Sequence, residues 1–195
     1  MKENIELHTI ESAPPNSKEA LQEVQGAYGF IPNLMAVMAG SPAVIKGYKT
    51  LSAIYDSTSF TPTERQIVLL ATSFENGCDY CMAAHTTIAN MQKVDGEIIE
   101  SLRKGTPILD DKLEALRLFT VEVAREKGWP SASATQRFLS ASYTPSAMLE
   151  VVLGVGLKTI SNYINHIANT PLDKAFEAAA WEKPSCGASQ CGCSH

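Results

Sequence analysis

Residues 75–85 of this chain carry the sequence ENGCDYCMAAH, in which three reactive side chains follow one another at helical spacing. Gly77 predicts the end of one helix, so that Cys78 begins the next one. On that helix Cys78, Cys81 and His85 occupy positions i, i+3 and i+7 and share one face. A thiol near a helix N-terminus ionises more readily than a free thiol. The stretch therefore indicates a thiol-redox site.

The composition is that of an ordinary globular protein. The chain has 195 residues, of which 45% are hydrophobic and 19% charged, and it is long enough for one domain with a sizeable core. A net charge of −5 with scattered Lys and Arg residues does not indicate a nucleic-acid partner. The longest apolar stretch, residues 148–157, contains Glu150 and two glycines, and no apolar leader follows Met1. We therefore expect a soluble, cytoplasmic protein with no membrane segment.

Capping residues mark the starts of the predicted helices. Thr61 is followed by Pro62 and, three residues after the cap, by Glu64, which together form a capping box with proline at the first helical position. Thr144 precedes another proline at the start of a long apolar helix, and Asp111 predicts a further helix start. After the first residues, no sustained alternation of apolar and polar side chains indicates a strand. The sequence therefore predicts an all-α fold.

The chain divides into three parts by composition. Residues 1–16 alternate apolar and polar side chains and end near two prolines, which predicts an extended N-terminal arm. Residues 17–182 carry the helical signals and are predicted to form a single-domain helical bundle. Residues 183–195 are rich in cysteine, glycine and serine, a composition that cannot pack a core alone. We therefore expect one folded domain with an arm before it and a cysteine-rich tail after it.

The five cysteines fall into two groups. Cys78 and Cys81 lie within the helical domain, whereas Cys186, Cys191 and Cys193 lie in the tail. This clustering is not typical of a secreted domain held together by disulfides. In a reducing compartment, a cysteine pair this close is more often redox-active or metal-binding than structural.

The length of helix between Cys78 and His85 disfavours a zinc site shared by all three side chains. Seven residues separate the two positions, which corresponds to about 10 Å along a regular helix. Zinc–ligand bonds of about 2.0–2.3 Å cannot gather both ends of that span. Cys81 and His85 could share a metal only with ligands from elsewhere. A structural role, with the thiols as small buried hydrophobic groups, is the other alternative.

The spacing of the two thiols suits redox chemistry. Residues i and i+3 of a helix lie about 5–6 Å apart, within the Cα separation that a disulfide tolerates. As a thiolate, Cys81 can attack the O–O bond of a peroxide and become a sulfenic acid, with which Cys78 condenses to a disulfide. His85, one turn beyond Cys81, can shuttle the proton or hold the thiolate as an ion pair.

Residues 74–85 resemble the active-site signature of the alkylhydroperoxidase D-like branch of the carboxymuconolactone decarboxylase superfamily. Residues 61–68 are similar to the run that precedes this signature, and residues 157–173 resemble a subgroup of the family. The similarity covers most of residues 30–178. The cysteine pair with the following histidine is its most specific part.

The resemblance implies an all-helical fold of the alkylhydroperoxidase D-like type that assembles into homo-oligomers, trimers or hexamers, through helix packing. It implies a thiol-dependent peroxidase in which Cys81 is the peroxidatic thiol, Cys78 the resolving thiol and His85 part of a proton relay. The implied substrate is a hydroperoxide and the implied reductant is an external dithiol. Neither a cofactor nor a metal is required.

Two positions depart from the family's pattern. Tyr80 stands where some members carry a second histidine, so that a hydroxyl replaces an imidazole there. Gln66 stands where some members place a relay glutamate, and a glutamine cannot give up a proton. Glu64 and Glu75 are the nearest carboxylates along the chain. We expect an exposed structural role for Glu64, because it already takes part in the capping box. The sequence leaves open whether Glu75 replaces the missing relay glutamate.

Asn162, Asn165 and His166 introduce polar groups into the apolar helix that starts after Thr144. Buried polar groups need hydrogen-bond partners, so a satisfied core network is the default interpretation of these residues. If this face of the helix is turned toward Cys81, it lines the substrate pocket instead.

The tail carries Cys186, Cys191, Cys193 and the terminal His195. Three thiols and an imidazole are enough ligands for a soft metal. The same thiols can shuttle electrons to a disulfide in the helical domain. A flexible end with incidental thiols is the third possibility.

The sequence therefore predicts a thiol-dependent peroxidase that uses a Cys-x-x-Cys disulfide cycle. A redox-sensing or partner-binding protein that uses the same disulfide as a switch is the main alternative. Carboxymuconolactone-type decarboxylation is a weaker alternative, because the lactone decarboxylases of this superfamily typically lack the cysteine pair.

Overall fold

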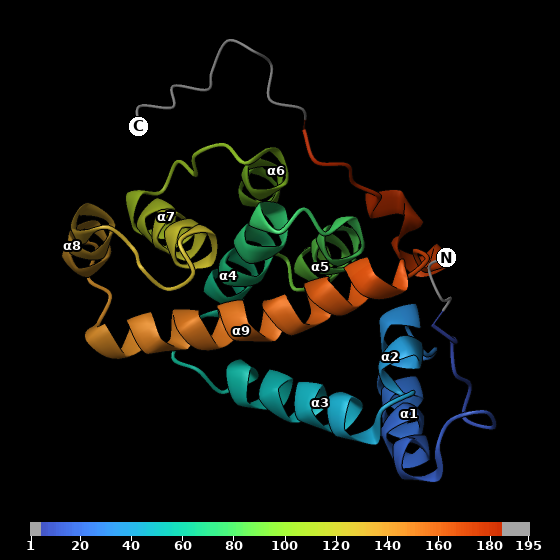
Figure 1. The fold of residues 1–195 in the computed structure, drawn as a ribbon. Coiled ribbons are helices and arrows are strands. Elements are labelled where there is room, and N and C mark those ends of the chain that lie inside the picture. Colours follow the sequence, from blue (N-terminus) through green and yellow to red (C-terminus); the bar gives the residue numbers. More distant parts are fainter. Residues whose placement is uncertain (1–4, 185–195) are drawn as a thin grey trace.

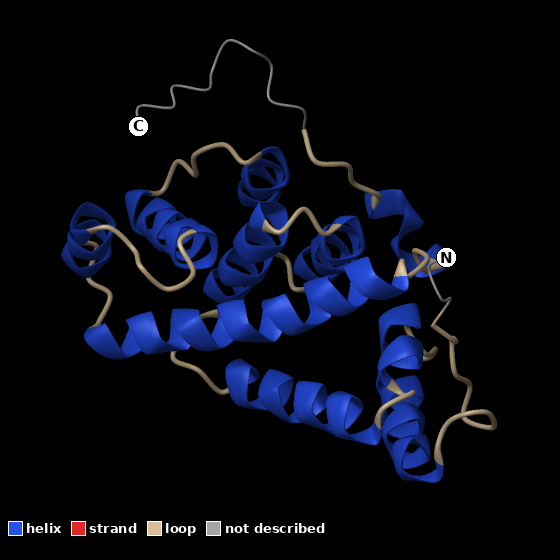
Figure 2. Ribbon diagram, viewed as in Figure 1, coloured by secondary structure: helices blue, strands red, loops and turns tan. Residues whose placement is uncertain are grey.

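The computed structural model describes residues 5–184, and every regular element in this part of the chain is a helix (Figure 1; Figure 2). The prediction of an all-α fold is confirmed. The elements are α1 (Pro15–Tyr28), α2 (Asn33–Met38), α3 (Pro42–Asp56), α4 (Pro62–Glu75), α5 (Asp79–Met91), α6 (Gly96–Lys104), α7 (Asp111–Arg125), α8 (Ala132–Ser140), α9 (Pro145–Ala168) and the short 3₁₀ helix η1 (Lys174–Ala179).

The long helix α9 runs through the middle of the fold, between two groups of helices (Figure 1). α2 and α3 pack against one side of it, and α4, α5 and α7 pack against another. At the crossing with α3 and α4, a Cβ atom on Gly154 would lie 2.7 Å from Val68 Cγ1 and 2.8 Å from Tyr55 Cε2. Because Cβ atoms do not tolerate such short contacts, this close crossing of three helices requires a glycine. The crossing fixes α9 against α4, the helix that leads into the cysteine pair.

By length and composition alone, α9 could cross a membrane, and it is the one such helix in residues 5–184. Its packing is that of a core helix, because it is contacted by helices on both sides. Three of its polar side chains, Lys158, Asn162 and Asn165, are buried in the protein. We therefore describe α9 as the central helix of the fold.

The capping box predicted at Thr61 is present. The Thr61 hydroxyl accepts a hydrogen bond from the backbone N–H of Glu64 (3.2 Å), and the Glu64 carboxylate accepts one from the backbone N–H of Thr61 (2.9 Å). The predicted cap at Thr144 is also present, and its hydroxyl accepts a hydrogen bond from the N–H of Ala147 (3.1 Å). These two caps start the helices that carry most of the core around the thiols.

The predicted start of α7 is wrong by one residue. The cap is Asp110 rather than Asp111, and its side chain accepts a hydrogen bond from the first turn of the helix. Glu114 accepts a hydrogen bond from the backbone N–H of Ile108 (2.8 Å) and pairs with Arg117 (2.6 Å). Two adjacent aspartates are equally suited to cap the helix by sequence alone. The cap is Asp110, and Glu114 binds the backbone of the preceding loop.

After α9 the chain folds back along α5 (Figure 1). We call residues 170–184 the C-terminal segment. Arg103 on α6 holds this segment by donating hydrogen bonds to the backbone carbonyls of Ala179 and Ala180, both at 3.0 Å. The carbonyl of Arg103 accepts a hydrogen bond from Trp181 Nε1 (2.7 Å). The C-terminal segment therefore covers the helix that follows the first cysteine.

Candidate active site

The turn between α4 and α5 sets the positions of the two cysteines. Gly77 takes a left-handed conformation (φ 64°) directly after α4, and Cys78 is the N-cap residue of α5, as predicted. The backbone N–H of Cys78 donates to the carbonyl of Ser73 (3.0 Å), which ties the turn to α4. Cys81 follows in the first turn of α5. Both cysteines are free thiols and are buried, with exposed fractions of 0% and 1%.

α9 supplies the polar surroundings of the thiols. Asn165 Nδ2 lies 3.3 Å from Cys81 Sγ and 3.8 Å from Cys78 Sγ, and it donates to both sulfur atoms. Cys81 Sγ lies 3.7 Å from the Ser161 hydroxyl. Lys158, Ser161 and Asn165 occupy positions i, i+3 and i+7 of α9, the same spacing as the two cysteines and the histidine of α5. Two polar faces therefore meet between α5 and α9.

Lys158 is a buried cation at this site. It is 1% exposed, and no carboxylate in residues 5–184 lies within 4.0 Å of its ammonium group. A buried ammonium without an anion is strongly unfavourable. Burial alone would lower the pKa of Lys158, but the neighbouring Cys81 and Tyr48 groups raise it above its ordinary value. The neighbouring Cys81 and Tyr48 groups, rather than a carboxylate, are therefore what favours the charged form of this lysine.

The two thiols ionise unequally. Burial opposes ionisation of Cys81, but the hydrogen bond from Cys78 and the charge of Lys158 hold the pKa of Cys81 well below its ordinary value. The pKa of Cys78 is raised, first by its hydrogen bond to Cys81 and then by burial. The site therefore favours a thiolate at Cys81 beside a protonated thiol at Cys78.

His85 lies one turn after Cys81, and its Nδ1 is 3.0 Å from Gln66 Oε1. An amide oxygen only accepts hydrogen bonds, so Nδ1 carries the hydrogen and Nε2 is left as a base. Gln66 in turn donates through its Nε2 to Gln92 Oε1 (3.1 Å). Burial, and then the charge of Lys158, lower the pKa of His85 well below its ordinary value. His85 is therefore neutral, and the positive charge beside the thiols belongs to Lys158.

Neither of the two nearby carboxylates reaches the thiols. Glu64 has the structural role expected of it, but its expected exposure is wrong, because Tyr143 donates to its carboxylate (2.9 Å) and Lys112 pairs with it (3.1 Å). Glu75 accepts two hydrogen bonds from Arg125 (2.9 and 3.0 Å) and is held toward α7. In this structure Glu75 does not replace the relay glutamate.

The hydroxyl of Tyr80 does not face the thiols. It donates to the Asp173 carboxylate (2.5 Å) and accepts a hydrogen bond from the backbone N–H of Leu34 (3.2 Å). Asp173 also accepts a hydrogen bond from the backbone N–H of Asn33 (3.1 Å). These bonds join α5 to α2 and to the C-terminal segment, so the role of Tyr80 is structural.

The three polar residues singled out on α9 have different surroundings. Asn165 contacts the thiols. Asn162 accepts a hydrogen bond from Asn76 Nδ2 (2.8 Å) in the core, which confirms the default interpretation for this residue. His166 is exposed and stacks on Tyr163, with a centroid distance of 6.5 Å. It is therefore not part of a buried core network, but it is among the residues that line a cavity beside the thiol turn, together with Gly77 and Asn165.

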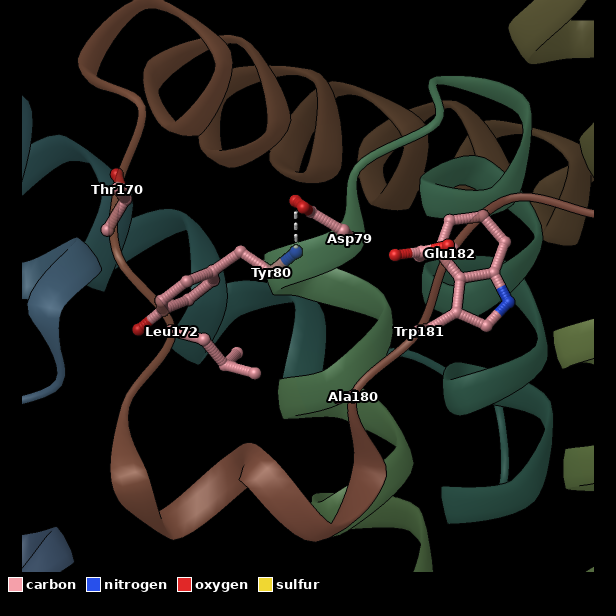
Figure 3. Close-up of a pocket in the computed structure, with 7 residues that line it drawn as sticks. All are labelled: Asp79, Tyr80, Thr170, Leu172, Ala180, Trp181 and Glu182. Carbon is pink, nitrogen blue, oxygen red and sulfur yellow. Dashed lines mark hydrogen bonds between the residues drawn. The ribbon is translucent and has the colours of Figure 1, made fainter.

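Two cavities, each of about 430 Å³, lie beside the thiol turn. Figure 3 shows the first cavity, between Tyr80 on α5 and Leu172 and Trp181 of the C-terminal segment. The second cavity is lined by Gly77 and Asn165. The two cavities share Asp79, Thr170, Trp181 and Glu182. Asn165 Oδ1 is buried and has no hydrogen-bond partner among the described residues, so Asn165 links the second cavity to the sulfur atoms.

The sequence does not single out Lys158 or Ser161 as site residues. A signal for them is present, because polar residues at positions i, i+3 and i+7 of an apolar helix are typical of a buried polar face. Within residues 5–184, no group of three or more His, Cys, Asp or Glu side chains is arranged to hold a metal ion. The predicted roles of the tail cysteines and His195 lie outside the described residues.

The model of the carboxymuconolactone decarboxylase family matches residues 42–121 of the chain. This match runs from α3 into α7 and includes both cysteines of the helical domain. Among curated proteins, none matches the sequence.

Solved structures share the fold over almost the whole chain. The alkylhydroperoxidase AhpD core protein of Ralstonia eutropha JMP134, described as an uncharacterized peroxidase-related protein, has a TM-score of 0.78 at 17% identity, covering 87% of this chain and 92% of its own. A peroxidase-related protein of Silicibacter sp. TM1040 has a TM-score of 0.75 at 14% identity, covering 90% and 97%. The debrominase Bmp8 has a TM-score of 0.75 at 16% identity, covering 89% and 94%.

At identities of 17% and 14%, these solved structures show a shared fold. The family model matches the segment of the chain that carries the two thiols. The matched segment and the shared fold agree with the resemblance found in residues 61–85. Residues 42–121 of the chain therefore match the carboxymuconolactone decarboxylase family, and the chain shares its fold with the alkylhydroperoxidase AhpD core protein.

Proposed function

We propose that this chain is a thiol-dependent peroxidase that reduces hydroperoxides with Cys81 and Cys78. The observation that carries the proposal is the buried Lys158, which has no carboxylate within 4.0 Å in residues 5–184 and whose charge lowers the pKa of Cys81. Peroxide reduction needs a thiolate at neutral pH as its nucleophile. The description of two structural neighbours as peroxidase-related supports this reading.

The first step is attack of the Cys81 thiolate on the terminal oxygen of the hydroperoxide. The S–O bond forms, the O–O bond breaks, and the alkoxide leaves while Cys81 becomes a sulfenic acid. Lys158 gives the alkoxide its proton. The proton becomes available because the ammonium loses its counter-charge when the thiolate turns into a neutral sulfenic acid.

The second step closes the disulfide. The sulfur of Cys78 attacks the sulfur of Cys81, and the hydroxyl group leaves as water with the proton of Cys78. His85 relays this proton through Nε2, which its bond to Gln66 leaves free. The products of the cycle are an alcohol and water, and the protein is oxidised by two electrons.

An external dithiol restores the thiols by disulfide exchange. Cys81 returns as the thiolate, and Lys158 regains its proton from the incoming dithiol. Neither a cofactor nor a metal takes part in this cycle. We propose a soluble, cytoplasmic protein, since a reducing compartment supplies the dithiol.

The outer face of α9 supports assembly into a homo-oligomer. Five of its large apolar side chains are between 38% and 72% exposed: Leu149, Val152, Ile160, Tyr163 and Ile167. Apolar side chains that recur along one helix are typical of helix packing between subunits. We expect copies of the chain to pack through this face, as trimers or hexamers.

A redox switch is the second candidate function. The burial of both thiols favours it, because exposed fractions of 0% and 1% limit access by a substrate or a reductant. A switch forms the same disulfide without fast turnover. Debromination is a further activity to test. A cysteine-to-alanine variant of the debrominase Bmp8, which shares this fold, has been solved in complex with 2,3,4-tribromopyrrole.

The proposal is tested by the consumption of cumene hydroperoxide with a small dithiol present, in the wild type and in Lys158→Met. We expect turnover in the wild type and a loss of about tenfold or more in Lys158→Met at pH 7, because the thiolate loses its counter-charge. Lys104→Met is the matched control, since Lys104 is exposed and pairs with Glu100 on the surface. It should keep the wild-type rate.

Equal turnover in the wild type and in Lys158→Met would contradict the role of Lys158 and leave peroxidase activity in place. Two other results would contradict the peroxidase itself. Disulfide formation without turnover, with every dithiol tried, would favour the switch. Release of bromide from 2,3,4-tribromopyrrole by a protein that does not consume hydroperoxide would favour debromination.

A further inference from the structure

The two cavities beside the thiol turn share four lining residues, Asp79, Thr170, Trp181 and Glu182. Asp79 comes from the start of α5, and the other three come from the C-terminal segment (Figure 3). Each cavity has a volume of about 430 Å³. Pockets that hold small organic molecules have volumes of about 300–1,000 Å³. We call the two cavities with their four common residues the shared site.

The shared site carries two carboxylates that no cation pairs with. Within residues 5–184, no Lys, Arg or His nitrogen lies within 4.0 Å of the carboxylate oxygens of Asp79 or Glu182. Asp79 Oδ1 accepts a hydrogen bond from the backbone N–H of Tyr80 (2.7 Å). The two carboxylates come from different walls of the site (Figure 3). A cavity lined by charges of one sign attracts ligands of the opposite sign.

The nitrogen groups that border the second cavity are bound elsewhere. Lys183 Nζ donates a hydrogen bond to the backbone carbonyl of Glu75 (3.1 Å) and lies 5.2 Å from the centre of the Phe74 ring. The ring of His166 stacks on Tyr163. The negative charge of the shared site is therefore not neutralised by the side chains that line it.

Trp181 contributes aromatic surface to both cavities. Its Nε1 donates to the backbone carbonyl of Arg103 (2.7 Å), and its ring packs against Phe74 with a centroid distance of 5.7 Å. Because the one polar group of the indole is already bonded, Trp181 offers the cavities ring surface rather than a donor. The face of a tryptophan ring attracts ammonium and guanidinium groups. Tyr80 and Leu172 extend this wall in the first cavity (Figure 3).

Two residues at this site have a buried oxygen that lacks a hydrogen-bond partner. They are Asn165 with its Oδ1 and Thr170 with its Oγ1, and neither oxygen has a partner among the described residues. Both residues line the second cavity, and Asn165 is only 4% exposed. An amide oxygen can only accept hydrogen bonds, and a buried acceptor without a donor is unfavourable. What the site lacks is therefore a hydrogen-bond donor.

We propose that the shared site binds a small organic cation, in which a primary ammonium or a guanidinium group is attached to a flat apolar group. The N–H groups of the cation bond to the carboxylates of Asp79 and Glu182 and to the hydroxyl of Thr170. The apolar group lies against Trp181 and Leu172. A quaternary ammonium fits less well, because it has no N–H group for these acceptors. This binding needs no step of the peroxidase cycle, so it is independent of the function proposed above.

The test follows the fluorescence of Trp181 while 2-phenylethylamine is added to the reduced, full-length protein at pH 7. The chain has two tryptophans, and Trp129→Phe removes the other one, which is 85% exposed. We expect a saturable change in fluorescence as the ligand reaches the indole ring. Isothermal titration calorimetry of the wild type is expected to give the same dissociation constant, which shows that Trp129→Phe has not altered the site.

Three ligands with the same ring separate charge from apolar contact. 2-Phenylethanol has no charge, and 3-phenylpropionate has the opposite charge. We expect both to bind at least about tenfold more weakly than 2-phenylethylamine, because neither has a cation for the two carboxylates. N,N,N-Trimethyl-2-phenylethylammonium keeps the positive charge without N–H donors. We expect it to bind more weakly than the primary amine and more tightly than the alcohol.

Variants of the lining residues locate the binding. Asp79→Asn/Glu182→Gln removes both charges and keeps an acceptor for the N–H of Tyr80. We expect this double variant to raise the dissociation constant of 2-phenylethylamine about tenfold or more. Glu126→Gln/Glu177→Gln is the matched control, because it changes the net charge equally at exposed positions outside both cavities. It should keep the wild-type affinity.

Thr170→Val tests the oxygen that lacks a partner. The variant removes the hydroxyl at nearly constant volume, and no hydrogen bond within residues 5–184 is lost with it. We therefore expect the free energy of unfolding to stay the same or to rise. The dissociation constant of 2-phenylethylamine is expected to rise about threefold or more, because the ligand loses an acceptor.

Three results would overturn this inference. The first is the absence of saturable binding in both fluorescence and calorimetry. The second is equal affinity for 2-phenylethanol, which would show adventitious apolar binding only. The third is an affinity that falls equally in Asp79→Asn/Glu182→Gln and in its matched control, or in neither. Each of them leaves the peroxidase standing, because no variant in this test changes Cys78, Cys81 or Lys158.

Discussion

The amide nitrogen of Asn165 lies 3.3 Å from the sulfur of Cys81, and both side chains are buried. A hydrogen bond to a charged acceptor is worth about 1.5–3 kcal/mol. Asn165→Leu removes this donor at nearly constant volume. We expect the pKa of Cys81 to rise, and the rate of its alkylation by iodoacetamide at pH 7 to fall by about tenfold to a hundredfold.

The control for this prediction is Asn90→Ala on the exposed end of α5, which should leave the alkylation rate unchanged. Alkylation rates measured from pH 5 to pH 10 give the pKa in each variant. An unchanged pKa in Asn165→Leu would mean that the contact does not stabilise the thiolate.

The stability of the reduced protein is expected to depend on the ionisation of Cys81. Because the folded pKa of Cys81 lies below its unfolded value, the thiolate contributes stability that is fully present above the unfolded pKa, about 8.5. This contribution is lost as the pH falls through the depressed folded pKa. Between these two values the slope is about 1.4 kcal/mol per pH unit.

The matched variant for this pH dependence is Cys81→Ala/Lys158→Met, because it removes both charges and leaves no unpaired lysine. Urea unfolding of reduced protein at several pH values measures the difference in unfolding free energy. We expect the wild type to gain stability relative to this variant as the pH rises toward about 8.5. A difference that stays constant with pH would show that Cys81 is not a thiolate in the folded protein.

Gln66→Glu is expected to turn His85 into a titrating group. The new carboxylate would accept the Nδ1–H bond that Gln66 accepts now at 3.0 Å, and it would favour the charged imidazolium. We expect the pKa of His85 to rise by about one unit or more, measured by NMR titration of its ring protons. Gln136→Glu, on the exposed side of α8, should leave the pKa of His85 where it is. A His85 titration that is identical in both variants would show that position 66 does not control the imidazole.

Two glycines of α9 provide a paired test of the packing. In Gly154→Ala the new methyl group would meet Val68 and Tyr55 at 2.7 and 2.8 Å, so we expect a loss of about 1–3 kcal/mol in unfolding free energy. In Gly156→Ala nothing lies within 4 Å of the added carbon, and we expect no loss or a gain of up to about 1 kcal/mol from helix propensity. Chemical denaturation of both variants measures the difference. Equal stabilities would contradict the close crossing of α3, α4 and α9.

Local signals in the sequence account for the parts of the fold that were predicted correctly. The Thr61 capping box and the Gly77 break act over four residues or fewer, so their effect can be read without knowing the rest of the chain. They were sufficient to place Cys78 at the start of a helix. The helix over 96–104 was not predicted, because it is short and begins with Gly96, a poor helix former.

The charge at the site could not be derived from the sequence in the same way. Lys158 acts through its burial, and burial depends on how α9 packs against α5, which is set by contacts far apart in the chain. The same holds for Glu75, whose pairing with Arg125 depends on the position of α7. Sequence spacing singled out Cys81, the nucleophile that we propose, whereas the contact with Lys158 that lowers the pKa of Cys81 depends on tertiary packing.

The central claim is that Cys81 becomes a sulfenic acid when it meets a hydroperoxide. The direct measurement is mass spectrometry of Cys78→Ser protein treated with one equivalent of hydroperoxide and dimedone, with the three tail cysteines replaced by serine. We predict a dimedone adduct on Cys81, formed faster at pH 7 in this protein than in one that also carries Lys158→Met. An unmodified Cys81, or an adduct that forms equally fast without Lys158, would contradict the account.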